Sequence, residues 1–115
     1  MIFVIDDDRV MAECMVRACG GEVKVFSDAI SAIGAISDGL LPDLIFLDIL
    51  LDGPDGFTFL NELASYVDTA KIPVVIVSSL DYAKMDLSEY GVVGFLSKEK
   101  MIPKEIRDYA KKYAG

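Results

Sequence analysis

The chain has 115 residues, of which 53% are hydrophobic, so it is long enough for one domain with a core and too apolar to remain disordered. Eleven Lys and Arg against nineteen Asp and Glu give a net charge of −8, which argues against nucleic acid or anionic lipid as a direct partner. The sequence has no histidine, which excludes Ser-His and Cys-His catalysis and phosphohistidine chemistry on this chain, and disfavours a zinc site.

Short apolar runs alternate with amphipathic stretches along the whole chain. Apolar or alternating residues predict five strands, at Ile2–Ile5, Glu22–Phe26, Leu44–Leu47, Val74–Val77 and Gly94–Leu96. Capping residues and helical spacing predict five helices: Arg9–Cys19 after the cap Asp8, a second after Ser27, a third opened by Asp55-Gly56, a short polar one over Asp81–Tyr90, and a last one with Pro103 in its first turn.

Each longer helix has a stripe of apolar residues that we expect to face the core. The stripes are Val10, Cys14 and Ala18; Ile30, Ile33 and Ile36; Phe57, Leu60, Ala64 and Val67; and Ile106, Tyr109 and Tyr113. The two cysteines, Cys14 and Cys19, are therefore interpreted as buried thiols in a reducing compartment. No apolar run reaches the length of a membrane span, and residues 1–6 lack a signal-peptide pattern, so we expect a cytoplasmic protein.

Strands that alternate with helices predict a parallel sheet with helices on both faces, in which ligands bind at the carboxyl ends of the strands. Polar residues follow four of the predicted strands at these ends: Asp6, Asp7 and Asp8; Asp48; Ser78 and Ser79; and Lys98. Neighbouring carboxylates repel one another, and a hard divalent cation such as Mg²⁺ removes the conflict. With Lys98 and Ser78, such a site could hold a phosphoryl group, which a carboxylate can also accept covalently.

The motifs Ile5-Asp6-Asp7, Asp48 with Asp55-Gly56, Val77-Ser78-Ser79 and Phe95-Leu96-Ser97-Lys98 resemble the receiver domain of bacterial two-component response regulators, of the CheY-like type. The resemblance covers essentially the whole chain and implies a single receiver domain over residues 1–115. It implies an α/β fold, a flavodoxin-like doubly wound (βα)5 three-layer sandwich with a five-stranded parallel sheet in the order 2-1-3-4-5.

The resemblance also implies a role for each site residue. Asp48 would be the phosphoacceptor and a metal ligand, Asp7 a direct Mg²⁺ ligand and Asp6 a ligand acting through water. Leu50 would offer its backbone carbonyl to the metal. Ser78 and Lys98 would contact the phosphoryl group, and Phe95 stands where the family has a switching aromatic residue.

By the same resemblance, a sensor histidine kinase or a histidine phosphotransfer protein would donate the phosphoryl group. The chain would be a switch and not a turnover enzyme, and it would contact a downstream protein through the face formed by Asp81–Tyr90, Gly94–Leu96 and the last helix. Two positions depart from the family, because Asp52 and Glu99 stand where proline is usual. We expect a trans peptide bond before Glu99.

Two other functions stay open from the sequence alone. A receiver-like adaptor that is never phosphorylated is compatible with the departures at Asp52 and Glu99. A phosphatase of the haloacid-dehalogenase type would use Asp6 as nucleophile and Asp8 as acid, although such enzymes normally have a further acidic motif and a longer chain.

Overall fold

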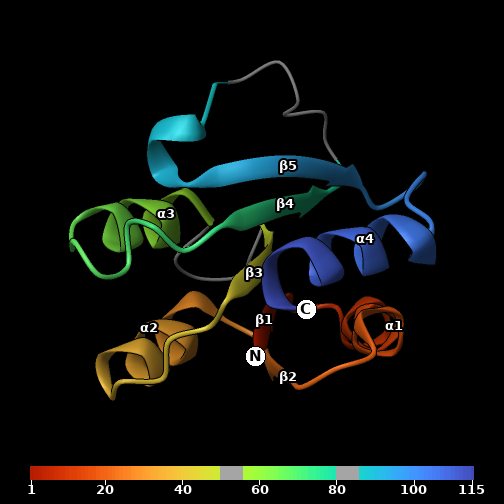
Figure 1. Cartoon of the computed structure of the whole chain (residues 1–115), viewed down its shortest axis with the longest axis horizontal. Helices are drawn as coiled ribbons and strands as arrows, with labels where there is room; N and C mark the ends of the chain where they lie inside the picture. Colours follow the sequence, from red (N-terminus) through yellow and green to blue (C-terminus); the bar gives the residue numbers. More distant parts are fainter. Residues whose placement is uncertain (50–55, 80–85) are drawn as a thin grey trace.

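Five parallel strands form the centre of the computed structural model, which describes residues 1–49, 56–79 and 86–115. The strands are β1 (Ile2–Ile5), β2 (Val23–Phe26), β3 (Leu44–Asp48), β4 (Val74–Ser78) and β5 (Val92–Ser97) (Figure 1). Their order in the sheet is β2-β1-β3-β4-β5, all parallel, which confirms the predicted fold class and strand order.

The described residues also form four α-helices and one turn of 3-10 helix, of which the last helix follows β5 and the others lie between strands. They are α1 (Arg9–Cys19), α2 (Ala29–Ser37), α3 (Gly56–Ala64), η1 (Ser88–Tyr90) and α4 (Pro103–Ala114). The α-helix predicted over Asp81–Tyr90 is wrong for its described part, since only η1 is helical there and residues 81–85 lie outside the described residues. The described helical turn ends at Gly91, whose φ of 78° is the left-handed conformation that terminates a helix.

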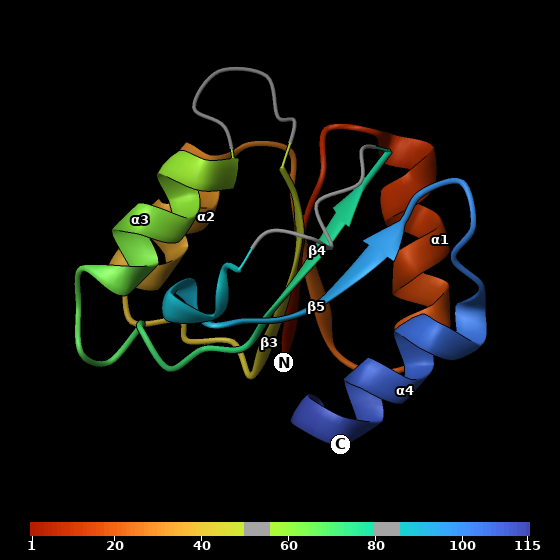
Figure 2. The ribbon, with the colours of Figure 1, turned by 90° about the horizontal axis from the view of Figure 1, so that it is seen from above.

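Helices cover both faces of the sheet and create two separate cores. In Figure 2, α2 and α3 lie on one side of the strands and α1 and α4 on the other. The fully buried Phe3 and Ile45 point into the first core, whereas their chain neighbours Val4 and Phe46 point into the second. Burial on both faces explains why β1, β3 and β4 are apolar at nearly every position.

The predicted apolar stripes are confirmed for α4, where Ile106 is buried, and only in part for α3, where Leu60 is buried, and for α1 and α2. Val10, Ile30 and Val67 are exposed, and Val67 lies beyond the end of α3. Cys14 is exposed as well, which contradicts its interpretation as a buried thiol, whereas Cys19 is half-buried. The buried positions are Ala12 and Met15 in α1, Ala29 and Ala32 in α2, and Phe59, Leu60 and Leu63 in α3. Small side chains let α1 and α2 pack closely on the sheet, so size as well as hydropathy decides the face.

Gly56 lets α3 begin directly against the end of β3. Its backbone N–H donates a 3.0 Å hydrogen bond to the carbonyl oxygen of Ile49. A Cβ atom at Gly56 would lie 2.6 Å from the Cα of Ile49, which is closer than real Cβ contacts occur. A glycine is therefore required here, and this contact closes the segment that follows Asp48.

The described helices include none with both the length and the apolar character that crossing a bilayer requires.

Candidate functional site

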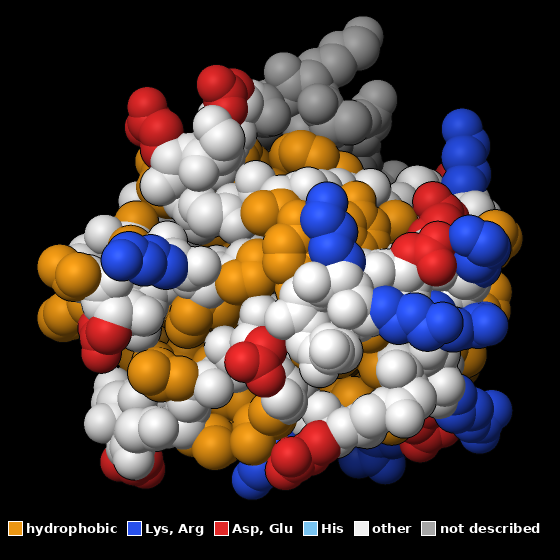
Figure 3. All heavy atoms as spheres, in the orientation of Figure 1, with side chains coloured by type: hydrophobic (Ala, Val, Ile, Leu, Met, Phe, Trp, Pro, Cys, Tyr) orange, Lys and Arg blue, Asp and Glu red, His pale blue; other side chains and the backbone are white. Residues whose placement is uncertain are grey.

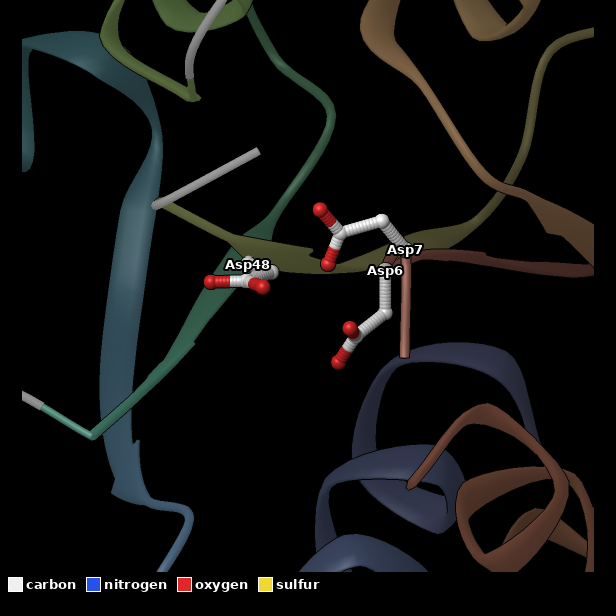
Figure 4. Close-up of side chains that lie close together, drawn as sticks. All are labelled: Asp6, Asp7 and Asp48. Carbon is white, nitrogen blue, oxygen red and sulfur yellow. The ribbon is translucent and has the colours of Figure 1, made fainter. Parts of the chain in front are cut away.

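Three carboxylates meet at the carboxyl ends of β1 and β3. The strands pair with Ile5 opposite Leu47, so Asp6 and Asp48, each the next residue along, are neighbours in the sheet. Asp6 is 3% exposed and Asp48 4% exposed, whereas Asp7 is exposed to solvent. Figure 4 shows the three side chains gathered at this edge, and their ligand oxygens lie within 4.8 Å of one another. The sequence prediction that these acids converge is confirmed.

Lys98 lies between the two buried carboxylates. Its Nζ lies 3.0 Å from Oδ2 of Asp6 and 3.0 Å from Oδ2 of Asp48, and it donates hydrogen bonds to Oδ1 of Asp6 and Oδ2 of Asp48. The residue follows β5, where its backbone N–H donates a 3.0 Å hydrogen bond to the carbonyl oxygen of Ser78. Side-chain exposure of Lys98 is only 17%, so water screens these ion pairs weakly.

The surroundings of Asp6 do not fully compensate its charge. The backbone N–H of Asp8 donates a 2.8 Å hydrogen bond to Oδ1 of Asp6, but buried Oδ2 accepts no hydrogen bond despite its short distance to the Lys98 ammonium. Burial raises the pKa of Asp6, and the negative charge of Asp48 adds to this, against the opposing effects of the Asp8 N–H and Lys98. At neutral pH this carboxylate therefore destabilises the metal-free fold.

The pKa of Lys98 is shifted in the direction that favours its charged form. Burial lowers the pKa of its ammonium, but the hydrogen bonds to Asp48 and Asp6 outweigh burial and leave the pKa above its usual value. Lys98 therefore stays positively charged at neutral pH and remains a counter-ion for both acids.

Ser78 and Phe95 occupy the two strands next to the acidic cluster. Ser78 is the last residue of β4, buried, and paired with Ser97 of β5 immediately before Lys98. Phe95 lies half-buried on β5 opposite Ile76 and packs against the core under α2 and α3. The predicted contact of Ser78 with a phosphoryl group and the predicted switching role of Phe95 stay predictions.

The loop after β3 contains further predicted positions that the structure does not describe. Leu50, Asp52 and Asp55 lie outside the described residues. The described peptide bonds are all trans, including the bond before Glu99, as predicted.

Two features of the site were missed by the sequence prediction. Asp8 does cap α1 as predicted, by accepting a 3.2 Å hydrogen bond from the Met11 N–H, but its own backbone N–H also orients Asp6. In the sequence, an Asp two residues before a helix N-cap indicates a turn in which the side chain of that Asp accepts a hydrogen bond from the N–H of the cap residue. Beside the acids lies a pocket of about 650 Å³, lined by Asp6, Asp7, Arg9, Arg17 and Ser27 among others, which no local pattern indicates because α1 and β2 form it together.

The donor set fits a hard divalent cation. Three carboxylates and one ammonium leave two negative charges, and buried Oδ2 of Asp6, although 3.0 Å from the Lys98 ammonium, accepts no hydrogen bond from the described residues. Mg²⁺ binds through carboxylate oxygens and keeps several waters, which the exposed side of the cluster at Asp7 allows. The residues present therefore fit magnesium chemistry.

Comparison with known proteins decides the family. A family model described as "Response regulator receiver domain" matches residues 2–111. The chain belongs to the response regulator receiver domain family. It is thus a receiver domain of the kind found in two-component response regulators, and this supports the receiver interpretation over a phosphatase of the haloacid-dehalogenase type.

Relatives of this receiver domain are longer proteins. It is 34% identical to Response regulator PleD of Caulobacter vibrioides over 102 residues, which are 84% of this chain and 22% of PleD. It is 33% identical to a protein-glutamate methylesterase/protein-glutamine glutaminase of Hahella chejuensis, over 87% of this chain and 29% of that protein. The chain spans about a quarter of the length of these curated relatives, so their whole activities do not carry over.

Solved structures agree with the fold. A putative response regulator from Chloroflexus aurantiacus superposes with a TM-score of 0.82 at 28% identity, covering 97% of this chain and 94% of the other. The receiver domain of NtrX from Brucella abortus gives a TM-score of 0.77 at 29% identity, covering 98% and 97% of the two chains. Both matches extend over nearly the whole of each chain, so the receiver fold accounts for this chain from end to end.

Proposed function

We propose that this receiver domain accepts a phosphoryl group on Asp48 from a phosphohistidine donor, with Mg²⁺ held by the carboxylates of Asp6, Asp7 and Asp48. The observation that carries the proposal is the buried Asp48 carboxylate at the end of β3, paired with Lys98 and flanked by two further acids. A buried acid at a strand end needs partners, and this set of partners also suits a phosphoryl group.

The transfer forms one bond and breaks one. A carboxylate oxygen of Asp48 attacks the phosphorus, and the P–N bond of the donor breaks as the new O–P bond forms. The donor imidazole keeps the electron pair and takes up a proton from water. The Lys98 ammonium, 3.0 Å from Asp48, is positioned to neutralise charge on the phosphoryl oxygens, while a bound Mg²⁺ supplies the larger part of that neutralisation.

The phosphohistidine donor lies outside these 115 residues, because they contain no histidine. A sensor histidine kinase or a histidine phosphotransfer protein supplies the phosphohistidine. The acceptor role is stoichiometric, so the domain acts as a switch and not as a turnover enzyme.

Ser78 and Phe95 convert the new charge into a change of surface. The Ser78 hydroxyl, at the end of β4, turns toward the phosphoryl oxygens, and Phe95 on β5 changes its packing. The surface that responds consists of η1, β5 and α4, through which a downstream protein binds. Exposed Val93 and half-buried Tyr109 offer apolar contacts on this face.

Mass spectrometry after phosphodonor treatment tests the acceptor. With acetyl phosphate and Mg²⁺, we expect the wild-type chain to gain one phosphoryl group that maps to Asp48. Asp48→Asn should gain none, whereas Asp108→Asn, which removes an exposed carboxylate, should behave as wild type. Equal uptake by Asp48→Asn would show that another residue is the acceptor. No uptake by the wild type would favour the adaptor that is never phosphorylated, and label on Asp6 would favour the phosphatase.

A further inference from the structure

A groove of about 300 Å³ lies between the C-terminal halves of α2 and α3. Its apolar lining includes Ile33 and Ile36 from α2, Leu63 from α3 and Tyr66 just after it. Because these helices run back along the strands, their C-terminal ends lie at the end of the sheet opposite the acidic site (Figure 2). No residue of the acidic cluster lines this groove. The groove is therefore separate from the phosphoacceptor site.

Apolar side chains remain exposed beside this groove. Tyr66 is 56% exposed, and the adjacent Val67 is 84% exposed. Figure 3 shows hydrophobic side chains reaching the surface over the α2 and α3 end beside one basic side chain, whereas most Lys and Arg side chains on this face lie over α4 and α1. Large apolar side chains grouped at a concave surface are typical of a site for another protein.

The groove is also negatively charged. The carboxylates of Glu62 and Asp68 line it, and none of the described residues that line it is basic. Both α2 and α3 lack a basic residue in the last turn, and Asp38 is the C-cap of α2. The negative ends of two helix dipoles therefore meet beside two carboxylates, and the one basic residue in the turn after α3, Lys71, does not line the groove.

The other two helices provide the contrast. Arg17 lies in the last turn of α1, and Lys111 and Lys112 lie in the last turn of α4. A cation at a helix C-terminus stabilises it, so only the pair of helices at the groove lacks this compensation. An external cation would supply it.

The α3 side of the groove has a fixed geometry. Thr69 is buried, and its hydroxyl donates a 2.6 Å hydrogen bond to the carbonyl oxygen of Leu63 at the end of α3. The backbone N–H of Ala70 donates a 2.8 Å hydrogen bond to the carbonyl oxygen of Tyr66. The turn that carries Tyr66 and Asp68 is thus held in place before any partner binds.

We propose that this groove binds a basic, amphipathic segment of a partner protein. An Arg or Lys side chain of the segment lies between Glu62 and Asp68, and an adjacent apolar side chain packs on Ile36, Leu63 and Tyr66. A volume of about 300 Å³ accepts one or two side chains, so the contact is a weak and reversible one.

An NMR titration of the whole chain tests this surface. The probe is a blocked 12-residue helical peptide with Leu and Arg on one face and Ala elsewhere, and its counterpart carries Glu in place of Arg. We expect the Arg peptide to shift the amide signals of Ser37, Leu63 and Thr69, and the Glu peptide to leave them unchanged. Raising the salt concentration should weaken the binding of the Arg peptide.

Two double variants with the same change of net charge distinguish binding in the groove from a general attraction of the basic peptide to an acidic protein. The double variant Glu62→Gln, Asp68→Asn should bind the Arg peptide about 3- to 10-fold more weakly than the wild type, as expected for the loss of two partly exposed charge contacts. Glu13→Gln with Glu22→Gln makes the same change of charge on and next to α1, on the other face of the sheet, and should change the affinity by less than about two-fold.

Three results would overturn the proposal. They are equal weakening by both double variants, equal binding of the Glu peptide, and amide shifts confined to the edge that carries Asp6 and Asp7. Each of these can occur whether or not Asp48 accepts a phosphoryl group.

Discussion

Replacing Asp6 by Asn should stabilise the metal-free protein and remove most of its response to Mg²⁺. The carboxylate is 3% exposed, its Oδ2 accepts no hydrogen bond, and burial raises its pKa. A raised pKa means that the folded state favours the neutral form, so the ionised form costs stability at neutral pH. Asn resembles the neutral form and keeps an oxygen that can accept the hydrogen bond from the Asp8 N–H. Lys98 retains its ion pair with Asp48.

The expected gain for Asp6→Asn is about 1 kcal/mol, because the burial cost of the carboxylate is lost, Lys98 had compensated part of that cost, and Lys98 keeps Asp48 as its partner. For a chain of this length, about 1 kcal/mol corresponds to a rise in melting temperature of about 4 °C. Mg²⁺ at about 100 times its dissociation constant should stabilise the wild type by about 2.7 kcal/mol and the variant much less. Asp6→Asn should therefore be more stable than the wild type without magnesium, and the wild type should be more stable than Asp6→Asn with it.

Thermal unfolding followed by circular dichroism, with and without Mg²⁺, measures both effects. Glu22→Gln removes an exposed carboxylate and should leave both melting temperatures within about 2 °C of wild type. The gain from Asp6→Asn should shrink as the pH falls below the raised pKa of Asp6, because wild-type Asp6 is then protonated in the folded state. A lower melting temperature for metal-free Asp6→Asn, or an unchanged response to Mg²⁺, would refute the reasoning.

Three further perturbations test the packing and the thiols. Gly56→Ala places a Cβ 2.6 Å from the Cα of Ile49, and we expect urea unfolding to show a loss of about 2 kcal/mol. Thr69→Val removes a buried hydrogen bond of 2.6 Å to a carbonyl at the end of α3, which should cost about 1–2 kcal/mol in the same assay. Burial raises the pKa of Cys19 to about 11, whereas Cys14 is exposed, so a thiol reagent at pH 8 should label Cys14 at least about 100 times faster.

Each of these expectations has a clear contrary result. Gly34 has open space around its Cβ position, so Gly34→Ala is the control for Gly56→Ala, and equal stability of the two variants would contradict the close approach. Thr58→Val makes the same chemical change inside α3 at a more exposed position, and an equal loss at both sites would assign no special role to the Thr69 hydroxyl. Equal labelling rates for the two thiols would show that burial of Cys19 is too weak to matter.

The acidic cluster could be predicted from sequence because one local rule suffices. Asp6, Asp48, Ser78 and Lys98 each stand at the end of an apolar strand, and parallel strands bring their carboxyl ends to one edge. The position of Asp6 Oδ2, which lies 3.0 Å from the Lys98 ammonium but accepts no hydrogen bond, could not be predicted in the same way. It depends on angles and distances among side chains from β1, β3 and β5, which no local pattern encodes.

The helix faces show where pattern reasoning failed. Val10 and Ile30 begin apolar stripes at helical spacing, yet they lie in solvent, and the alanines Ala12, Ala29 and Ala32 face the sheet. Helical spacing identifies a helix but gives two or three overlapping stripes when apolar residues are frequent. The choice among stripes depends on how closely the helix approaches the strands, and small side chains allow the closer approach.

The sequence by itself determined the strands, four of the helices and the edge at which the acids meet, because hydropathy period, caps and strand ends are local properties. Tertiary structure alone decided which faces of α1 and α2 are buried, that Lys98 joins both Asp6 and Asp48, and that the ends of α2 and α3 form an acidic groove. These features depend on distances between segments far apart in the chain. Such distances are set by the packing of the whole sheet and its helices, and not by any one stretch of residues.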